Sequence, residues 1–451
     1  MKKLLLIHPA TITETAGWGE TKSWGMPPLG LAYVAASTPD NWEVKILDEY
    51  TDKIDFGVKA DIVGITSYTV NAPRAYQIAG EFRKRGITTV MGGIHASMMP
   101  EEALKHTDAV VVGEAEFIWE KVISDFENKR LKRKYTAERM PLNDLPIPRR
   151  DLFSDKYVMD VIQTTRGCPF NCEFCSVTSF NGAEYRQRPV NEVLDELETI
   201  KKKVVYFVDD NILGFGKSAE QRSMDLFRGM LERKINKIWI TQTSINIADN
   251  PEILKYAYKS GCRFVFIGIE SIIQDTLEEM KKAINLKKGI ENLSKAIRRI
   301  QNSGIGVIGA FIVGNDHDDI TVFRKTLDFI NRAQLDVFQL SYLTPFPGTK
   351  LYGRMEREGR IFYDNFPGDW ERCDMDQVMI RPKKMTIDEL IRGYDYIIRQ
   401  KITTPKILLQ FLRTLVNTRD VITAVLGYNF NRDFQKYVVP DDRFHGAGGG
   451  V

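Results

Sequence analysis

Two stretches of this 451-residue chain alternate short apolar strand patterns with amphipathic helical patterns. In the first stretch, five strand patterns rich in Val, Ile and Leu cover residues 3–8, 43–47, 61–66, 88–92 and 109–112. Helical patterns separate them at residues 29–37, 73–85, 101–105 and 116–127. Apolar strands that alternate with helices are typical of a parallel sheet covered on both faces. Residues 1–127 are therefore predicted to form a doubly wound, Rossmann-like α/β domain.

The alternation resumes over residues 156–345 with six strand patterns and five helical patterns. The strand patterns cover residues 158–165, 204–209, 237–241, 264–269, 307–313 and 337–343, and the helical patterns residues 189–202, 219–233, 251–260, 287–303 and 319–333. Six such units predict a (β/α)6 partial barrel whose reactive loops follow the carboxyl ends of the strands. Between the two stretches, residues 128–155 contain a basic run and several prolines, which predicts an extended linker.

Residues 346–451 are predicted to form a small, mostly helical C-terminal domain that shapes substrate access, with helices at residues 387–400 and 406–417. Thr386, followed three residues later by Glu389, has the pattern of a capping box for the first of these helices. The glycine-rich end, residues 445–451, is expected to be a flexible tail.

The bulk composition limits the class of protein. A hydrophobic content of 43% and a charged content of 27% are those of a soluble globular protein. A net charge of +3 gives no strong field for nucleic acid or membranes, and the apolar run at the start is too short for a signal peptide or a membrane span. Five cysteines, three of them clustered, do not form a disulfide framework, so a reducing cytoplasm is expected.

The clustered cysteines, Cys168, Cys172 and Cys175, follow the first strand pattern of the second stretch with C-x3-C-x2-C spacing. Soft thiolates favour iron–sulfur clusters and zinc. Three thiolates on one loop can hold three corners of a cubic cluster and leave the fourth iron open for another ligand. Zinc is the alternative, but zinc sites usually pair cysteines in two C-x-x-C halves.

Small and polar residues follow the strand patterns of the first stretch. They are Thr66, Ser67, Gly92, Gly93, His95 and Glu114. Ligands of doubly wound sheets bind beyond the carboxyl ends of the strands, and glycines there allow the backbone to approach a bulky ligand. The alternative is that these glycines only form strand-to-helix turns. Because no G-x-G-x-x-G follows a strand, a dinucleotide is not supported.

The strand ends of the second stretch are also polar or carry glycine. The relevant residues are Asp209, Ser244, Glu270, Gly309 and Gly314. A carboxylate such as Asp209 or Glu270 suits the hydroxyl or ammonium groups of a small polar cofactor. One acid at a strand end is weak evidence, whereas six polar ends facing the same mouth as a three-cysteine loop are stronger together.

The cysteine motif, with Phe174 before its last cysteine, resembles the signature of radical S-adenosylmethionine enzymes. Several further segments resemble the cobalamin-binding subgroup of that family, namely residues 26–31, 92–97, 113–116, 206–211 and 268–271. The resemblance covers nearly the whole chain. It implies a [4Fe–4S] cluster, S-adenosylmethionine and methylcobalamin as cofactors, and an anaerobic methyltransferase reaction. A 5′-deoxyadenosyl radical would take hydrogen from an unactivated carbon, which would then receive a methyl group from methylcobalamin.

The resemblance also implies roles for individual residues. Cys168, Cys172 and Cys175 would ligate the cluster, and Phe174 would pack near the adenine of S-adenosylmethionine. The remaining roles fall to two groups: Asp209, Ser244, Glu270, Gly309 and Gly314 would contact S-adenosylmethionine, and Thr66, Ser67, Gly92, Gly93, His95 and Glu114 would line the cobalamin pocket. Residues 315–317 depart from the Gly/Pro turn that is commoner in the family, which weakens the assignments at that loop.

The Asp-x-His-x-x-Gly motif that supplies a cobalt-coordinating histidine in several other cobalamin proteins is absent. We therefore predict no histidine on the lower face of cobalt, and His95 is expected to be a pocket or structural residue. Cys262 is expected to be a small buried residue. Cys373 is a candidate catalytic residue that could donate hydrogen, ligate a metal or have no chemical role.

The leading interpretation is a radical methyltransferase acting on an unactivated carbon. A ring-forming or rearranging enzyme with the same cofactors, and a cofactor-sensing protein without catalysis, are the alternatives. The substrate is expected to be a peptide, a protein or a mid-sized metabolite, with a lean towards a peptide. An electron donor such as flavodoxin or ferredoxin is the expected protein partner, and neither nucleic acid nor a membrane span is expected.

Overall fold

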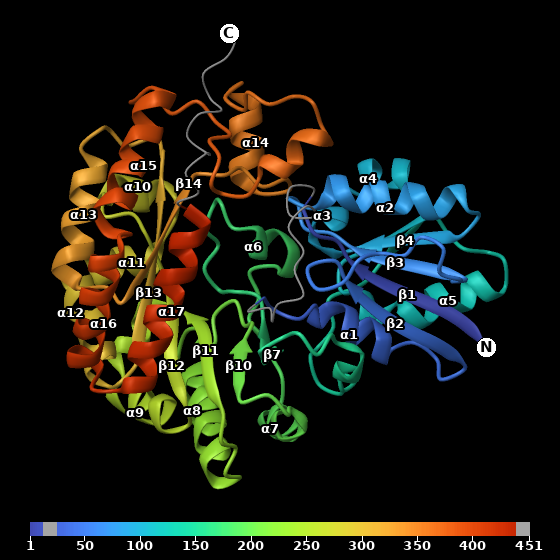
Figure 1. Cartoon of the computed structure of the whole chain (residues 1–451), viewed down its shortest axis with the longest axis horizontal. Coiled ribbons are helices and arrows are strands. Elements are labelled where there is room, and N and C mark those ends of the chain that lie inside the picture. Colours follow the sequence, from blue (N-terminus) through green and yellow to red (C-terminus); the bar gives the residue numbers. More distant parts are fainter. Residues whose placement is uncertain (12–24, 439–451) are drawn as a thin grey trace. The chain divides into compact units, whose positions relative to one another are not determined.

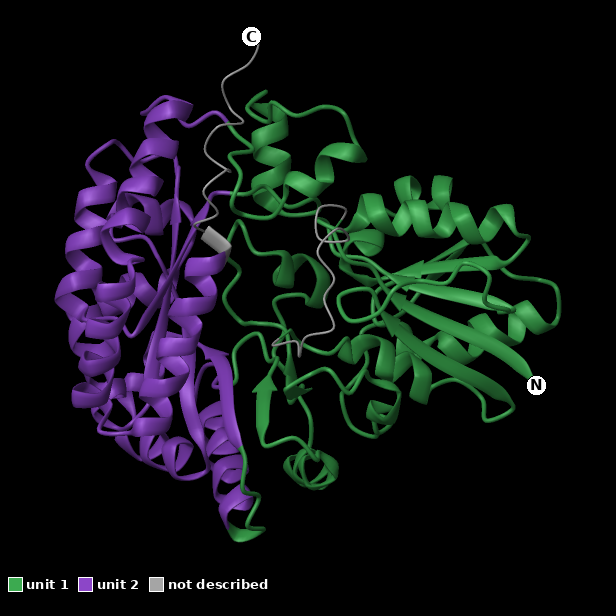
Figure 2. Cartoon of the chain, viewed as in Figure 1, with its two compact units in different colours: residues 1–212, 232–237, 344–380 green, residues 213–231, 238–343, 381–451 purple. Residues whose placement is uncertain are grey.

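The computed structural model describes residues 1–11 and 25–438 (Figure 1), so the predicted tail at residues 445–451 lies outside the described residues. The chain forms two compact units (Figure 2). Unit 1 contains residues 1–212, 232–237 and 344–380, and unit 2 contains residues 213–231, 238–343 and 381–451. The domain boundaries drawn from the sequence stay a prediction.

The first sheet lies in unit 1, and all of its strand pairs are parallel. Its strands are β1 (Lys2–His8), β2 (Trp42–Asp48), β3 (Ile62–Thr66), β4 (Thr88–Gly92), β5 (Ala109–Val112) and β6 (Lys134–Thr136). They are ordered β2-β1-β3-β4-β5-β6, so the chain reverses its direction of travel across the sheet beside β1. Ligands of such sheets bind at this kind of switch point, beyond the strand ends.

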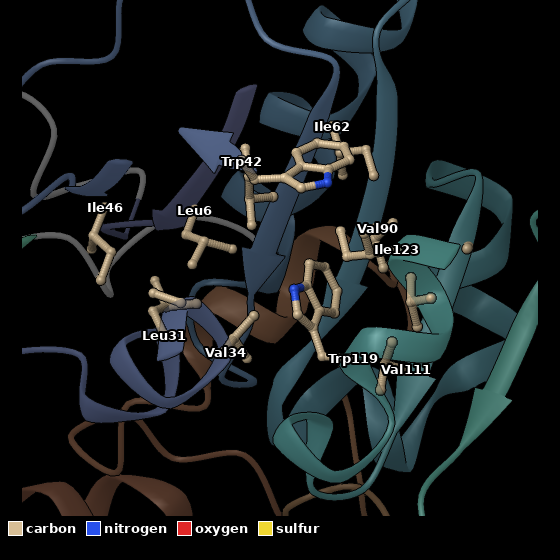
Figure 3. Packing of buried hydrophobic residues seen from close by; sticks show 14 of the residues in the cluster. Leu6, Leu31, Val34, Trp42, Ile46, Ile62, Val90, Val111, Trp119 and Ile123 are labelled. Carbon is tan, nitrogen blue, oxygen red and sulfur yellow. The ribbon is translucent and has the colours of Figure 1, made fainter. Parts of the chain in front are cut away.

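Helices cover both faces of this sheet (Figure 1). They are α1 (Leu29–Ala36), α2 (Ala72–Lys84), α3 (Gly93–Met98), α4 (Pro100–His106) and α5 (Trp119–Glu127). One core packs α1 and α5 on the sheet around Trp42 and Trp119 (Figure 3), and the other packs α2, α3 and α4 on the opposite face around Phe82. The predicted doubly wound fold is therefore confirmed.

The second region continues the alternation in parallel strands. In unit 1, β7 (Met159–Ile162) pairs with β10 (Val204–Phe207). In unit 2, β11 (Ile238–Thr243), β12 (Cys262–Glu270), β13 (Gly306–Val313) and β14 (Val337–Tyr342) pair in that order. The connecting helices are α7 (Val190–Thr199), α8 (Lys217–Glu232), α9 (Pro251–Lys259), α12 (Ile290–Asn302) and α13 (Val322–Ala333). The strand-helix units predicted for this region are thus present, with a second parallel sheet.

Two local expectations were wrong. The strand predicted at residues 158–165 ends early and is followed by a separate short strand, β8 (Thr165–Arg166), which pairs antiparallel with β9 (Arg186–Gln187). The cause is Asp209, because its carboxylate accepts hydrogen bonds from the backbone N–H groups of Thr164 and Thr165 and draws the chain out of the parallel ladder. In addition, β6 lies within the stretch expected to be a linker.

The C-terminal part is helical, as predicted, with α14 (Lys350–Arg357), α15 (Ile387–Lys401), α16 (Thr404–Thr418) and α17 (Val421–Val438). The capping box at the start of α15 is confirmed: Thr386 and Glu389 bond reciprocally. Helix α17 was not predicted. Within residues 1–11 and 25–438, no helix combines the length and apolar character needed to span a bilayer.

Candidate functional site

The three clustered cysteines lie in the loop that joins β8 to α6 (Ser176–Asn181), beyond the carboxyl end of β7. Cys172 is buried, Cys168 and Cys175 are half-buried, and none of them forms a disulfide. The backbone N–H of Cys172 donates to the carbonyl of Phe170 at 3.0 Å, and that of Cys175 donates to the carbonyl of Cys172 at 3.3 Å, so the loop turns tightly. Among the residues that the structure describes, no three His, Cys, Asp or Glu side chains are already arranged as a metal-binding group.

Two aspartates at the end of β10 hold the entrance of the cysteine loop. Asp209 is fully buried, and its Oδ1 accepts from the N–H of Thr164 at 2.8 Å and from the hydroxyl of Thr165 at 2.7 Å. Asp210 Oδ2 accepts from the N–H of Gly167 at 2.9 Å and from Asn181 Nδ2 at 3.1 Å. Burial, together with the neighbouring Asp209 carboxylate, raises the pKa of Asp210 to about 6. Asp210 therefore fastens the chain just before Cys168 to the end of α6.

A buried ion-pair network joins the cysteine loop to the loop that follows β5. Arg166 Nη1 lies 2.9 Å from Glu114 Oε2 and 2.5 Å from Glu116 Oε1, and its side chain is 7% exposed. Arg186 also pairs with Glu114, with Nη1 3.0 Å from Oε2. Burial alone would raise the pKa of Glu114, but Arg186 and Arg166 hold it below its ordinary value. Glu114 thus stays ionised and fixes the two loops to each other.

The segment at α14 contacts the cysteine loop from a distant part of the sequence. Arg354 Nε donates to Glu173 Oε1 at 2.8 Å, and the N–H of Leu351 donates to the Glu173 carbonyl at 3.1 Å. Lys350 Nζ donates to Asn171 Oδ1 at 2.8 Å. Both partners in the loop lie between the cysteines, so α14 sets the backbone on which the thiols are carried.

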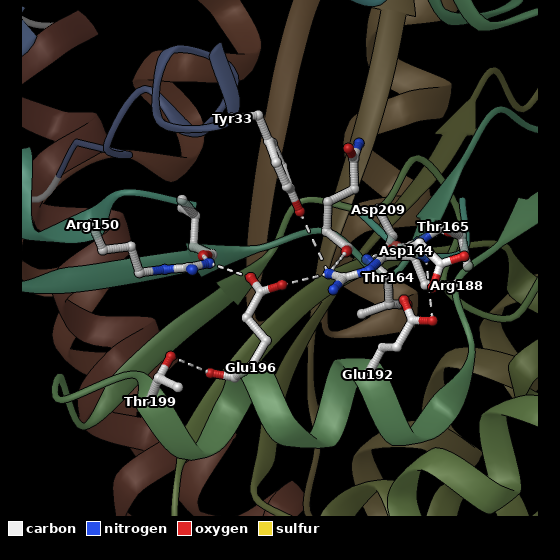
Figure 4. Close-up of polar contacts among 12 residues, drawn as sticks. Tyr33, Asp144, Arg150, Thr164, Thr165, Arg188, Glu192, Glu196, Thr199 and Asp209 are labelled. Carbon is white, nitrogen blue, oxygen red and sulfur yellow. Dashed lines mark hydrogen bonds and ion pairs between the residues drawn. The ribbon is translucent and has the colours of Figure 1, made fainter. Parts of the chain in front are cut away.

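A second buried charge cluster supports the strand that leads into the loop (Figure 4). Glu196 on α7 is 1% exposed and receives Arg150 Nη2 at 2.6 Å and Arg188 Nη1 at 2.7 Å. The two arginines also donate to the carbonyls of Val161 and Gln163, at 2.7 and 2.9 Å. One carboxylate therefore organises two cations that hold the backbone around the end of β7.

The predicted cobalamin residues gather at the carboxyl ends of β3 and β4. The N–H of Ser67 donates to the carbonyl of Gly92 at 3.0 Å. Gly93 has φ +90°, and a Cβ there would lie 2.7 Å from the backbone nitrogen of Ser67 and from Thr66 Oγ1, so only glycine fits. A Cβ on Gly92 would have only the Val111 carbonyl within 4 Å, at 3.8 Å. The carboxyl-end edge of the first sheet is therefore closely packed at Gly93 and open at Gly92.

The His95 ring is turned into the protein. It is 0% exposed, with Nδ1 3.4 Å from Thr69 Oγ1 and Nε2 3.2 Å from the Tyr76 hydroxyl and 3.3 Å from Glu102 Oε1. Trp370 Nε1 donates to the same Glu102 oxygen at 3.1 Å. Burial raises the pKa of Glu102, but hydrogen bonds from His95, Tyr76 and Trp370 outweigh it and hold the pKa below its ordinary value. His95 has the surroundings of a structural residue.

The remaining cysteines are buried. Cys262, at the start of β12, is 0% exposed, as expected for a small core residue. Cys373 is 2% exposed, and burial, followed by Asp374 and Asp369, raises its pKa to about 12. Cys373 is therefore a thiol at neutral pH.

Four predicted residues lie in unit 2, and three of them, Ser244, Glu270 and Gly314, lie at strand ends as expected. Glu270 ends β12 with φ +63°, and its Oε1 lies 2.7 Å from Lys282 Nζ. Ser244 follows β11 and donates from Oγ to Asn246 at 2.5 Å. Gly314 follows β13 at φ +92°, whereas Gly309 lies within β13, where a Cβ would meet Leu335 at 2.7 Å.

The structure thus brings the cysteines, Phe174 and Asp209 into the same compact unit as Thr66, Ser67, Gly92, Gly93, His95, Glu114 and Cys373. Ser244, Glu270, Gly309 and Gly314 belong to unit 2. Sequence reasoning missed Arg166, Arg186 and Arg354, the cations that hold the cysteine loop. The position of Arg166, immediately before the Gly167 turn, was the available signal.

Two protein families match this chain. Residues 25–123 match the B12 binding domain and residues 162–330 match the radical SAM superfamily. The chain is 32% identical to the bacteriochlorophyllide d C-8(2)-methyltransferase of Chlorobaculum tepidum. The alignment covers 92% of this chain and 94% of that relative. The chain is also 33% identical to the bacteriochlorophyllide d C-12(1)-methyltransferase of the same organism, in an alignment that covers 87% of this chain and 86% of the relative.

The fold also matches a solved structure. The radical S-adenosylmethionine methyltransferase TsrM from Kitasatospora setae, with cobalamin and a [4Fe–4S] cluster bound, has a TM-score of 0.69, with 16% sequence identity and coverage of 90% of each chain. That likeness concerns the fold, whereas the two family matches and the chain-long relatives concern the sequence. This protein therefore belongs to the cobalamin-dependent radical S-adenosylmethionine methyltransferase family, with a [4Fe–4S] cluster, S-adenosylmethionine and cobalamin as its cofactors.

Proposed function

We propose that this enzyme methylates a carbon atom of a small organic molecule, and that tetrapyrroles are the first class of substrate to test. Support comes from the two relatives of 32% and 33% identity, both named for methylating bacteriochlorophyllide d at numbered carbons. A peptide substrate, favoured weakly from the composition of the C-terminal segment, stays a prediction. The observation that carries the proposal is the three-cysteine loop lying in one compact unit with the sheet that matches the B12 binding domain.

The donor set fits an iron–sulfur cluster. Cys168, Cys172 and Cys175 are the proposed ligands, because three soft thiols on eight residues of one loop suit iron and leave one corner unfilled. When bound, the three cofactors supply a carbon-centred radical and a transferable methyl group. The chain contributes the position of the thiols, since Asp210 holds the backbone before Cys168 and Arg354 holds it at Glu173.

We assign the other predicted residues to binding. Thr66, Ser67, Gly92 and Gly93 would present the open edge of the first sheet to cobalamin. Glu114 would act through Arg166, keeping that edge and the cysteine loop in fixed register. The His95 ring, buried against Glu102, would hold α3 to α4 rather than touch the cofactor.

The remaining predicted residues are proposed as contacts for S-adenosylmethionine. Phe174 lies between two proposed cluster ligands, where it would pack on the adenine. Glu270, Ser244, Gly309 and Gly314 would supply contacts from the strands of unit 2, with Lys282 orienting the Glu270 carboxylate. For Asp209 we propose a positioning role at Thr164 and Thr165, and its contact with the ribose or amino group stays a prediction.

Cys373 and the electron donor complete the proposal. A buried thiol with a pKa of about 12 can donate a hydrogen atom but is poorly suited to bind metal as a thiolate. Cys373 therefore stays a candidate hydrogen donor. A flavodoxin or ferredoxin would supply the electron.

Anaerobic reconstitution tests the proposal directly. The protein is loaded with iron, sulfide and cobalamin, reduced, and incubated with S-adenosylmethionine and bacteriochlorophyllide d or source-cell extract. We expect 5′-deoxyadenosine and a product heavier by one methyl group. The Cys172→Ala variant should lose both products, while Cys262→Ala, which changes a buried cysteine outside the loop, should retain them.

Each other outcome has a defined meaning. Formation of 5′-deoxyadenosine with a product of unchanged carbon count would replace methylation by rearrangement or ring formation. A methylated peptide in the extract would restore the peptide prediction. Absence of 5′-deoxyadenosine from protein with intact cluster and cobalamin would refute the radical mechanism.

A further inference from the structure

Helices α16 and α17 expose a group of large apolar side chains, here termed the apolar face. Its members are Leu408, Leu409, Leu412, Val416, Val421, Ile422 and Val425, each between 42% and 73% exposed. They account for seven of the 17 large hydrophobic residues exposed in residues 1–11 and 25–438. Helices α16 and α17 lie side by side (Figure 1). Single exposed apolar residues are ordinary, but a group of them on neighbouring helices marks an interaction surface.

The apolar face follows the helical period. At about 100° per residue, Leu408, Leu409, Leu412 and Val416 fall within about 100° of one side of α16. The buried residues of α16, among them Gln410 and Thr414, fall on the opposite side. On α17, Val421, Ile422 and Val425 form a matching stripe, while Thr423 and Ala424 are buried. Each helix therefore has a packed side and an exposed apolar side.

The two helices are firmly attached to unit 2, so the exposure is not that of a frayed end. Thr423 Oγ1 donates to the Gly304 carbonyl at 3.0 Å, and Asn431 Nδ2 donates to the Asp336 carbonyl at 2.9 Å. In the two-residue connection between the helices, Asp420 accepts from the Tyr258 hydroxyl at 2.8 Å. These hydrogen bonds fix the two helices to the rest of unit 2, so the apolar face is exposed in the folded protein.

The two helices that carry the apolar face have more basic than acidic residues. Residues 404–438, which contain both helices, have five basic residues, Lys406, Arg413, Arg419, Arg432 and Lys436, and two acidic residues, Asp420 and Asp433. Asp420 is 9% exposed and lies against Arg263, at 3.4 Å. Burial, then Arg413 and Lys406, lower the pKa of Lys401 to about 8, as expected where cations gather without a carboxylate. The apolar face is thus carried by two helices with an excess of basic residues.

We propose that α16 and α17 dock this enzyme on the surface of an anionic lipid bilayer, with the apolar face in the acyl–headgroup boundary and the basic residues at the lipid headgroups. Helices that lie in the membrane interface have this division between apolar and Lys/Arg-rich sides. The helices lie on the surface and do not cross it. The inference is independent of the methyl-transfer reaction.

A second copy of the chain is the less favourable occupant. A twofold contact would place the same surface against itself, so the basic residues around one face would meet those around the other. Like charges brought together across an interface disfavour association, whereas anionic headgroups neutralise them.

Vesicle co-sedimentation of the cofactor-loaded protein tests the proposal. The vesicles are phosphatidylcholine alone, or equal parts phosphatidylcholine and phosphatidylglycerol. We expect binding to the anionic vesicles that weakens with added salt. Leu412→Glu combined with Val425→Glu should reduce the partition coefficient at least about tenfold, because two apolar contacts become charged. Lys406→Gln and Arg413→Gln should each reduce it about fivefold.

Matched substitutions elsewhere in unit 2 serve as controls. Ile320 is 59% exposed outside the apolar face, so Ile320→Glu should bind like the parent protein, as should Lys255→Gln on α9. Circular dichroism checks that each variant is folded. Failure of the parent protein to bind anionic vesicles would overturn the proposal, as would equal loss in the controls. A dimer in sedimentation velocity that Leu412→Glu dissociates, without vesicle binding, would assign the face to a second copy.

Discussion

Glu196 is the residue whose replacement should destabilise unit 1 most clearly. Its carboxylate is 1% exposed and accepts from two arginines whose side chains are 11% and 3% exposed. Glu196→Gln keeps the shape of the side chain but removes the negative charge that pairs with both guanidinium groups, of which Arg150 also pairs with Asp160 at 3.1 Å. Removing one partner of a buried ion pair typically costs about 3–5 kcal/mol, and because Arg150 keeps Asp160 the expected loss lies at the lower end of this range.

The same cluster should affect the site as well as stability. Arg150 and Arg188 bond the carbonyls of Val161 and Gln163, so a displaced guanidinium would loosen the strand that leads to the cysteine loop. Urea unfolding, followed by circular dichroism and tryptophan fluorescence, measures the loss of stability. Hydrogen exchange should show faster opening of residues 159–165 in the variant.

Glu198→Gln is the matched control for Glu196→Gln. Glu198 lies on the same helix, is 50% exposed and reaches Arg233 only at 3.7 Å, so its replacement should leave the unfolding curve within error of the parent. A loss below about 1 kcal/mol for Glu196→Gln would show that the other partners of the two arginines, Asp160 among them, satisfy their charge, and would refute the argument from their burial.

Three further changes test other parts of the structure. Gly93→Ala should lower the free energy of unfolding by about 1–3 kcal/mol, measured by urea unfolding, and should weaken cobalamin uptake, measured by absorbance. Gly30→Ala is the control and should not destabilise the protein, because no atom lies within 4 Å of the added methyl group. Lys401 has a pKa of about 8 in the folded protein and an ordinary value near 10.5 in the unfolded chain. Between these two pH values the unfolded chain binds more protons than the folded protein, so the free energy of unfolding should rise with pH. The rise should be smaller in Lys401→Gln, as measured by urea-unfolding midpoints at each pH. Asp210→Asn keeps an oxygen acceptor for the Gly167 N–H and should retain iron after reconstitution, whereas Asp210→Leu should lose most of the iron. Equal iron content in the two variants would refute the proposal that Asp210 holds the cysteine loop in place.

The strands could be predicted because burial on both faces leaves an uninterrupted apolar run. The predicted ranges 88–92 and 109–112 coincide with β4 and β5, where every residue except Thr88, Gly92 and Val112 is buried. The extent of β7 could not be predicted, because the bend depends on a carboxylate at Asp209 that reaches the backbone from 44 residues away. The edge strand β6 was hidden within a charged run, since only Tyr135 in it is buried.

The chemistry of the site was visible where it depends on local spacing, as in the cysteine loop. It was hidden where it depends on distant partners. Glu114 meets Arg186 across 72 residues, and Glu173 meets Arg354 across 181. One sequence gives no indication of which arginine will neutralise which carboxylate, because a charged side chain looks the same whether it ends in solvent or in a buried pair.

The make-up of unit 1 has a consequence for how the chain is synthesised. Its last segment, residues 344–380, supplies Trp370, whose indole bonds Glu102 across 268 residues. On the ribosome, the first sheet emerges early but must wait for more than half of the chain before this partner arrives. We expect the nascent protein to hold Glu102 and the cysteine loop incompletely covered during that interval. Until Lys350 and Arg354 bond Asn171 and Glu173, the backbone that carries the cysteines would also lack that support.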